Sequence, residues 1–282
     1  MNTILIAILS ITLIGMACAA ILSIVSKLMH VTVDERIEQI SAVLPGTNCG
    51  ACGFPGCGGY AAAMVEDSAV KSSLCTPGGA EAAAQISGIL GVEGEAVARR
   101  IAVVHCGGDH DAQKKKMTYT GIQSCYAAAA VFCGGNACAY GCLGYGDCKP
   151  ACPFDAICIT DGLARVNGSL CTGCGLCVAA CPRKLFSVRN IEKNPASEDS
   201  ASGNAASGKA FAVAAVACSN IEKAVVVRKK CSKACICCGR CVRECPEKAM
   251  VIENNLAKID YEKCSGCGYC AVVCPTKCVR AF

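Results

Sequence analysis

The distribution of apolar and charged positions separates a short uncharged start from a long remainder with brief apolar segments. Residues 3–26 contain no charged side chain. A helix of about 20 apolar residues, rising about 1.5 Å per residue, crosses a hydrocarbon core about 30 Å thick. The stretch is longer than the apolar part of a cleaved signal peptide, and no Lys or Arg precedes it. We therefore expect residues 1–28 to form a single transmembrane helix surrounded by membrane lipid.

The charges that follow this stretch predict its orientation. Lys27 and Arg36 come soon after it, and positively charged residues stay on the cytoplasmic side of a membrane. The main part of the protein is therefore expected on the cytoplasmic side, where thiols remain reduced. Cys18 lies in "GMAC", but the preceding residues lack the aliphatic lead and basic start of a lipid-attachment site. We interpret Cys18 as a membrane-facing thiol.

The rest of the pattern predicts an α+β protein that begins with a small helical domain, residues 31–100. Amphipathic residues 31–40 indicate a helix that ends near Pro45. A glycine-rich cysteine loop then leads into an alanine-rich helix, and this segment closes at Cys75. Residues 79–100 have helical composition.

Two similar segments mark an internal repeat. "RIAVVHCGG" and "FAVAAVACSN" are strand-like around Cys106 and Cys218, and each precedes a cysteine-rich region. We predict two pseudo-symmetric modules, residues 101–190 and 209–282. Residues 191–208 between them are rich in Asn, Ser, Ala and Gly, which is typical of a flexible linker.

Cysteine dominates the chemistry of the chain, because 29 of the 282 residues are Cys while Trp is absent. In a short secreted protein this frequency would suggest disulfides, but disulfide frameworks seldom repeat one pattern of CxxC pairs. With so few aromatic residues, ordinary apolar cores must be small. Bonds between cysteine and metal are therefore expected to hold much of the fold.

Two runs match the ferredoxin pattern CxxCxxCxxxCP, namely "CTGCGLCVAACP" at 171–182 and "CSGCGYCAVVCP" at 264–275. In ferredoxins with two clusters, three cysteines of a run bind one [4Fe-4S] cluster and the fourth binds the other cluster. Each run therefore needs a partner run. "CAYGCLGYGDCKPACP" at 138–153 and "CICCGRCVRECP" at 235–246 supply the partners.

Alignment of the two partner runs reveals one irregular position. Tyr145 stands where the second run has Cys238, so we assign the missing ligand of the first run to Cys138, upstream. In the second run Cys238 is present, which makes Cys231 dispensable. Cys231 in place of Cys235 is an alternative.

Exchange of the fourth ligands gives four ferredoxin-type clusters, and a fifth site lies in the helical domain. The ferredoxin-type sets are Cys138, Cys142 and Cys148 with Cys181; Cys171, Cys174 and Cys177 with Cys152; Cys235, Cys238 and Cys241 with Cys274; and Cys264, Cys267 and Cys270 with Cys245. The fifth set is Cys49, Cys52, Cys57 and Cys75. Zinc is an alternative for the fifth set because CxxC pairs also bind zinc, but its many glycines and the neighbouring ferredoxin runs favour iron and sulfide. We therefore expect five [4Fe-4S] clusters.

The other cysteines are interpreted as small buried apolar residues without metal. They are Cys18, Cys106, Cys125, Cys133, Cys158, Cys218, Cys231, Cys237 and Cys278. Cys106 and Cys218 are the strongest candidates for another role, because they occupy equivalent strand ends. Cys237 stands where such motifs often have glycine, and we expect it beside the cluster.

Charge and motifs favour an electron carrier over an enzyme with its own substrate site. The net charge is +5, and residues 209–282 hold 13 Lys and Arg against 6 Asp and Glu. This basic region either offsets the negative clusters or docks an acidic redox partner. No nucleotide-binding glycine pattern and no Ser/His/Asp set is present. We expect no catalytic residue and no nucleic-acid partner.

With these motifs, the chain resembles the B-subunit family of Rnf complexes, the ion-translocating ferredoxin:NAD⁺ oxidoreductases of bacterial membranes. The resemblance covers nearly the full length and rests on the uncharged start, "LPGTNCGACGFPGCGGYA" with Cys75, "AVVHCGG", "GDCKPACPFDAI" and the ferredoxin runs. It implies a place in the bacterial cytoplasmic membrane beside the other Rnf subunits. It also implies acceptance of electrons from soluble reduced ferredoxin, while NAD and flavins are bound by other subunits.

Two rival functions are compatible with the same motifs. One is a relay subunit of another membrane-bound complex, such as a hydrogenase or a formate dehydrogenase. The other is a redox sensor, whose clusters would be labile. For a relay, we expect electrons to enter through the basic module, residues 209–282.

Overall fold

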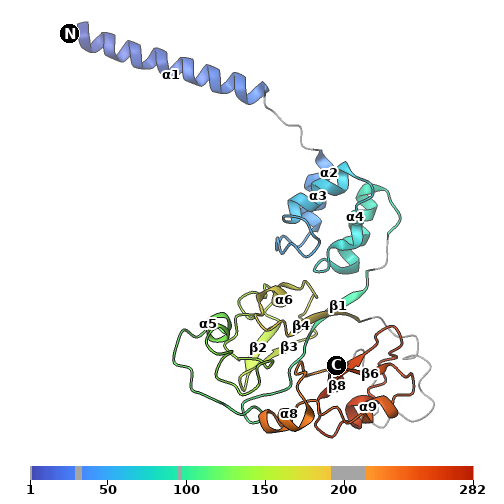
Figure 1. Cartoon of the computed structure of the whole chain (residues 1–282). Helices are drawn as coiled ribbons and strands as arrows, with labels where there is room; N and C mark the ends of the chain where they lie inside the picture. The colour runs from blue at the N-terminus through green and yellow to red at the C-terminus, as the bar shows by residue number, and fades with distance from the viewer. Residues whose placement is uncertain (1, 29–33, 95–96, 192–213, 282) are drawn as a thin grey trace.

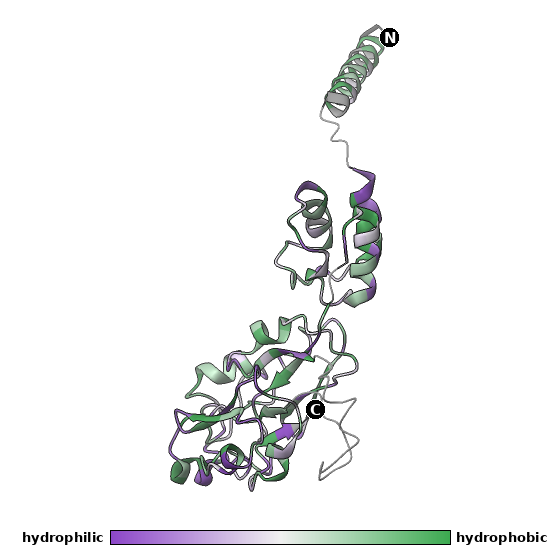
Figure 2. Ribbon diagram, turned by 90° about the vertical axis from the view of Figure 1, so that its right-hand side faces the viewer, coloured by the Kyte–Doolittle hydropathy of each residue, from purple (hydrophilic) through white to green (hydrophobic). Residues whose placement is uncertain are grey.

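The computed structural model describes residues 2–28, 34–94, 97–191 and 214–281 (Figure 1). The chain begins with helix α1 (Asn2–Leu28), and the side chains described along it are exposed. Apolar colours predominate on this helix in Figure 2. No helix in the described ranges combines the length and apolar character needed to cross a membrane. The expected helix is therefore confirmed, whereas the expected transmembrane span is not.

Three α-helices and one short 3₁₀ helix form the next unit. They are α2 (Glu35–Val43), α3 (Cys57–Glu66), η1 (Ser72–Leu74) and α4 (Gly79–Leu90). Ile40, Tyr60 and Ile86 are fully buried between them. The Tyr60 hydroxyl donates a hydrogen bond of 2.6 Å to the Lys71 carbonyl, which holds the loop before η1 on the helices. This packing places the cysteine loop that precedes α3.

The helical segment expected over residues 79–100 is shorter in the structure. Helix α4 ends at Leu90 because Gly91 takes a left-handed conformation with φ +69°. Strand β1 (Arg99–Val104) already begins within the expected range.

Within the described part of the chain, the remaining elements form four two-stranded antiparallel sheets and five short helices. The sheets pair β1 with β4 (Phe186–Ile191), β2 (Ile157–Thr160) with β3 (Leu163–Val166), β5 (Ala214–Val216) with β8 (Val279–Ala281), and β6 (Met250–Glu253) with β7 (Leu256–Ile259). The helices are α5 (Cys125–Ala130), α6 (Leu176–Ala180), α8 (Ala224–Lys230), α9 (Arg240–Arg243) and α10 (Tyr269–Val272). The mixture of short helices and strands agrees with the expected α+β class.

The same arrangement of strands occurs twice, as the repeat in the sequence suggests. The first strand of each module pairs with the last, so that Val104 lies opposite Phe186 and Val216 lies opposite Val279. A hairpin lies between them in each case, β2–β3 and β6–β7. Figure 1 shows the two modules side by side.

The two modules share an apolar contact between their first strands. Ile101 and Val103 of β1 pack with Ala215 of β5, and all three are buried. The predicted linker, residues 191–208, begins at Ile191, the last residue of β4; its other residues lie outside the described part of the chain. The modules are thus held together by packing between strands far apart in the sequence.

Candidate iron–sulfur sites

Five hollows in the described structure are lined by groups of cysteines. Their volumes are about 280–390 Å³, including the solvent at their mouths. The principal cysteines are Cys49, Cys52, Cys57 and Cys75; Cys152, Cys171, Cys174 and Cys177; Cys125, Cys142, Cys148 and Cys181; Cys235, Cys238, Cys241 and Cys274; and Cys245, Cys264, Cys267 and Cys270. We call them the Cys49, Cys174, Cys142, Cys235 and Cys264 sites.

In each of these sites the thiols surround a space instead of converging on one point. Within the described ranges, no three Cys, His, Asp or Glu side chains are placed to share a single metal ion. All 29 cysteines are free thiols, with no disulfide between them. Four cysteines around a hollow are the donor set that ferredoxins use for a [4Fe-4S] cluster.

Tight backbone turns wrap the ferredoxin-type sites. Gly173 has φ +68°, and a Cβ atom added to it would lie 2.4 Å from the Cβ of Arg100, so no larger residue fits without movement. Cys237 takes the corresponding left-handed position in its run with φ +52°. Cys237 lines the hollow of the Cys235 site, but it is only partly buried, unlike the buried thiol that the sequence suggests.

Backbone N–H groups donate hydrogen bonds to several of the cysteine sulfurs. Ala102 N lies 3.3 Å from the Cys171 sulfur, and Cys278 N lies 3.3 Å from the Cys274 sulfur. Leu185 N lies 3.5 Å from the Cys181 sulfur, the position in the first module that corresponds to Cys274. Such bonds hold sulfur ligands in place and influence the reduction potential of a bound cluster.

The structure differs from the sequence assignment at one ligand of the first module. Cys125, not Cys138, lies with Cys142, Cys148 and Cys181 around the Cys142 site. Tyr145, which replaces the expected cysteine, packs instead against the ring of Tyr119, with ring centroids 5.7 Å apart. The hollow is thus lined by a cysteine from outside the run, Cys125.

Asp147 provides the physical reason for the placement of Cys125. Its carboxylate accepts hydrogen bonds from Ser124 Oγ at 2.9 Å, Cys125 N at 3.0 Å and Tyr126 N at 3.1 Å. These bonds fasten the start of α5 to the residue before Cys148. Sequence spacing cannot reveal this bond network, although the loss of a ligand at Tyr145 signals that another cysteine must replace it.

Burial opposes ionisation of the cysteine thiols. It raises the pKa of Cys148, Cys177 and Cys270 to about 12 and the pKa of Cys241 to about 11. Without metal these groups are therefore neutral thiols at neutral pH. Cluster binding requires their thiolates, so it must release protons and compensate the buried charge.

Neighbouring sites lie close to one another. After burial, the nearby Cys49 sulfur contributes to the raised pKa of Cys174, which places the Cys49 site beside the first module. In that module Cys148 and Cys177 share one buried cluster of side chains. In the second module Cys241 and Cys270 are also neighbours. Each module thus brings its two sites together.

Comparison with protein families supports iron–sulfur chemistry in three parts of the chain. Residues 44–77 match the family described as "Putative Fe-S cluster". Residues 164–185 and 257–280 match the 4Fe-4S binding domain. The first match covers the Cys49 site, for which zinc was the alternative, and the others cover cysteines of both modules.

Several proteins of known name are similar to almost the whole chain. Identity is 38% to the B subunit of the Na(+)-translocating ferredoxin:NAD(+) oxidoreductase complex of Acetobacterium woodii, with 99% of this chain and 78% of the relative covered. It is 36% to the B subunit of the proton-translocating ferredoxin:NAD(+) oxidoreductase complex of Clostridium ljungdahlii, with 100% and 94% covered. It is 35% to the B subunit of the ion-translocating oxidoreductase complex of Methanosarcina acetivorans, with 95% and 94% covered.

The placement of Cys125 leads to a test of the Cys142 site. We expect Cys125→Ala to lower the iron content of the anaerobically purified protein by about four atoms per chain, because one cluster loses a ligand. The variant should lose the same paramagnetic resonance signal as Cys148→Ala. Cys158→Ala, which removes an exposed thiol of β2, is the matched control and should keep all the iron. Full iron content in Cys125→Ala would show that Cys125 is not a ligand.

Proposed function

Because this chain belongs to the B-subunit family of Rnf complexes, we propose that it carries electrons from reduced ferredoxin into an ion-translocating ferredoxin:NAD⁺ oxidoreductase. The observation that carries the proposal is the succession of five cysteine-lined hollows through the helical unit and both modules. We assign one [4Fe-4S] cluster to each hollow. The other subunits of such a complex are the proposed partners.

The cysteines and their surroundings determine what each site does. A [4Fe-4S] cluster supplies reversible transfer of one electron. The thiolates of each site hold it, the backbone N–H groups beside Cys171, Cys181 and Cys274 stabilise sulfur charge, and the apolar cores limit access of water. Ligation by four cysteines leaves no open iron for a substrate, which favours relay over catalysis at a cluster.

The ligand sets follow the geometry of the hollows. Four are those that the spacing predicts, and the Cys142 site takes Cys125 in place of Cys138. The alternative in which Cys231 displaces Cys235 is not favoured, because Cys235 lines the hollow with Cys238, Cys241 and Cys274. Residues 31–100, 101–190 and 209–282 then act as three cluster-bearing domains.

The basic second module is the proposed entrance for electrons. Cys238 and Cys267 are exposed ligands, one in each site of this module. Arg240, which lines the Cys235 site, is also exposed, as is Arg243 one turn later. A basic face around a shallow cluster suits an acidic redox partner, because charge complementarity speeds encounter.

Charge reversal tests this entrance. We expect Arg240→Glu to slow reduction of the protein by reduced ferredoxin about threefold at low ionic strength, and less at high salt. Lys149→Glu makes the same charge change beside Cys148 in the first module and serves as the matched control. Stopped-flow absorbance would measure both rates, with iron content as a check on cluster loading. A slower reaction in Lys149→Glu alone would place the entrance in the first module.

Helix α1 is the proposed means of membrane attachment. Residues 3–26 carry no charge, and the large apolar side chains described along α1 are exposed, among them Ile11, Leu13 and Leu22. Such a surface is favourable in lipid and unfavourable in water. We propose a single-pass anchor with the cluster-bearing part on the cytoplasmic side, where Arg36 follows the helix.

Fractionation tests the attachment. The full chain, expressed without other subunits, should remain in the membrane pellet after an alkaline carbonate wash, because its binding is apolar. Removal of residues 1–28 should move it to the supernatant with its iron content unchanged. Release of the full chain by the wash would contradict an anchor in lipid.

A further inference from the structure

A second group of buried cysteines lies between the two modules, outside the five sites described above. Its members are Cys106 and Cys138 from the first module and Cys218 and Cys231 from the second. Their exposed fractions are 7%, 7%, 9% and 8%. We call them the central group. They occupy equivalent positions in the repeat, because Cys106 and Cys218 each follow the first strand by two residues and Cys138 and Cys231 each stand four residues before Cys142 and Cys235.

The ends of strands β1 and β5 bring two of these cysteines together. His105 Nδ1 is hydrogen-bonded to the Val216 carbonyl at 3.0 Å, and Ser219 Oγ donates to the His105 carbonyl at 2.9 Å. A Cβ atom added to Gly107 would lie only 3.2 Å from the Ala217 carbonyl oxygen. The backbones on either side of Cys106 and Cys218 therefore lie directly against each other.

One short segment aligns the other two cysteines. Lys114 N donates to the Lys230 carbonyl at 2.9 Å, and the Lys114 carbonyl accepts from Ala137 N at 2.7 Å. Cys231 and Cys138 are the residues directly after Lys230 and Ala137. Lys114 of the first module thus lies between the two backbone segments that carry Cys138 and Cys231.

N–H groups also donate to these sulfurs, as they do to Cys171, Cys181 and Cys274. Cys142 N lies 3.3 Å from the Cys106 sulfur. The amide of Asn220, a side chain only 1% exposed, donates to the Cys138 sulfur at 3.4 Å. A thiol that served only as apolar filling would not need a buried amide donor.

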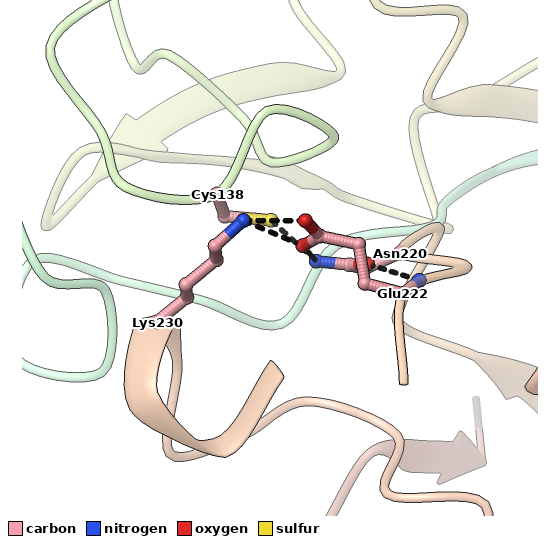
Figure 3. Close-up of polar contacts among 4 residues, drawn as sticks. All are labelled: Cys138, Asn220, Glu222 and Lys230. Carbon is pink, nitrogen blue, oxygen red and sulfur yellow. Dashed lines mark hydrogen bonds and ion pairs between the residues drawn. The ribbon is translucent and has the colours of Figure 1, made fainter. Parts of the chain in front are cut away.

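A polar network fixes the Asn220 amide in this position. Figure 3 shows Asn220 between the Cys138 sulfur and the carboxylate of Glu222. Asn220 Nδ2 donates to Glu222 at 3.0 Å, Glu222 N donates to Asn220 Oδ1 at 2.8 Å, and Lys230 pairs with the same carboxylate at 2.5 Å. The donor to Cys138 is therefore held by residues of the second module.

Asn220 also joins the two pairs of cysteines. It stands two residues after Cys218 and donates to the Cys138 sulfur at 3.4 Å. The four thiols, each less than a tenth exposed, therefore share one buried junction.

We propose that Cys106, Cys138, Cys218 and Cys231 bind a further [4Fe-4S] cluster at the junction of the two modules. The donor set is four cysteines, as at the five sites, and here all four are buried and two of them accept hydrogen bonds from N–H groups. Each module supplies two ligands, so neither module forms the site alone. The assignment also gives a role to Cys138, which the Cys142 site does not use.

The central group lies between one site of each module. On one side, Cys142 N contacts the Cys106 sulfur, and Cys142 belongs to the Cys142 site. On the other side, the buried Cys278 thiol lines the Cys235 site, and Ala217 N, directly before Cys218, donates to the Cys278 carbonyl at 2.7 Å. A cluster here would receive one electron from the second module and pass it to the first. That relay role rests on the proposed function, whereas the binding of iron does not.

The first test is the composition of the full chain purified without oxygen. Native mass spectrometry and iron and sulfide analysis should give six clusters, about 24 iron atoms per chain, and not five clusters with about 20. Five clusters would overturn the central site and leave the proposed relay intact. A protein without iron would overturn both. This measurement needs no variant and does not depend on the folding of one.

The second test identifies the ligands. Exchange of Cys106, Cys138, Cys218 or Cys231 for Ser should in each case remove the same paramagnetic resonance signal, one distinct from the signal lost in Cys125→Ala. Cys133→Ala, an exposed thiol near Cys138 in sequence, is the control and should change nothing. Unchanged signals in the Cys106 and Cys218 variants, or loss of the Cys125-dependent signal instead, would refute the proposal.

A third measurement tests whether Cys138 is a cluster ligand or only a packed side chain. Asn220→Ala removes the N–H donor to Cys138, so the potential of one signal alone should become more negative in a redox titration. If the potentials of all signals remain at their wild-type values, the Cys138 sulfur is not a cluster ligand.

Discussion

The need to neutralise buried cysteine sulfur is the physical constraint on which the rest of this structure depends. The apolar cores of both modules are made largely of small residues, and cysteines occupy central positions in them. Buried thiolates would lose hydration and repel one another, so they are tolerable only around cationic iron. The same bonds that hold the redox centres therefore close the modules, which have neither Trp nor large aromatic cores to do so.

The repeat gives this constraint a particular geometry. Within each module two short sheets and two cysteine runs surround two sites. The runs supply the sulfur ligands, and backbone N–H groups outside them, such as those of Ala102 and Cys278, donate to the sulfurs. Between modules, Ile101 and Val103 pack on Ala215 and bring the strand ends together. The junction is thus apolar at the strands and rich in cysteine beyond them. Each module alone holds only two sites. A continuous series of sites through both modules therefore depends on the packing of one module against the other.

Local spacing explains why much of the chemistry can be predicted from sequence. In the pattern CxxCxxCxxxCP the first three cysteines are close enough in the chain to surround one cluster. The fourth cysteine, next to the proline, binds the neighbouring cluster. The geometric groups around Cys174, Cys235 and Cys264 agree with that logic. Cys125 does not follow this spacing, because its backbone N–H donates to the distant Asp147 carboxylate, which positions its helix. The spacing of cysteines cannot predict the central group either, because its members come from four separate segments.

The sequence by itself determined the redox chemistry, the repeat and the family, because short-range cysteine patterns, glycine turns and long similarity to relatives are properties of consecutive residues. It also indicated, through Tyr145, that one ligand was missing from the first run. Only the tertiary structure brings Cys125 to the hollow of Cys142, Cys148 and Cys181 and places Cys106 and Cys231 at the same junction. Those relations depend on the pairing of β1 with β4 and of β5 with β8. They also depend on contacts such as Lys114 with Lys230, which join residues that no local pattern connects.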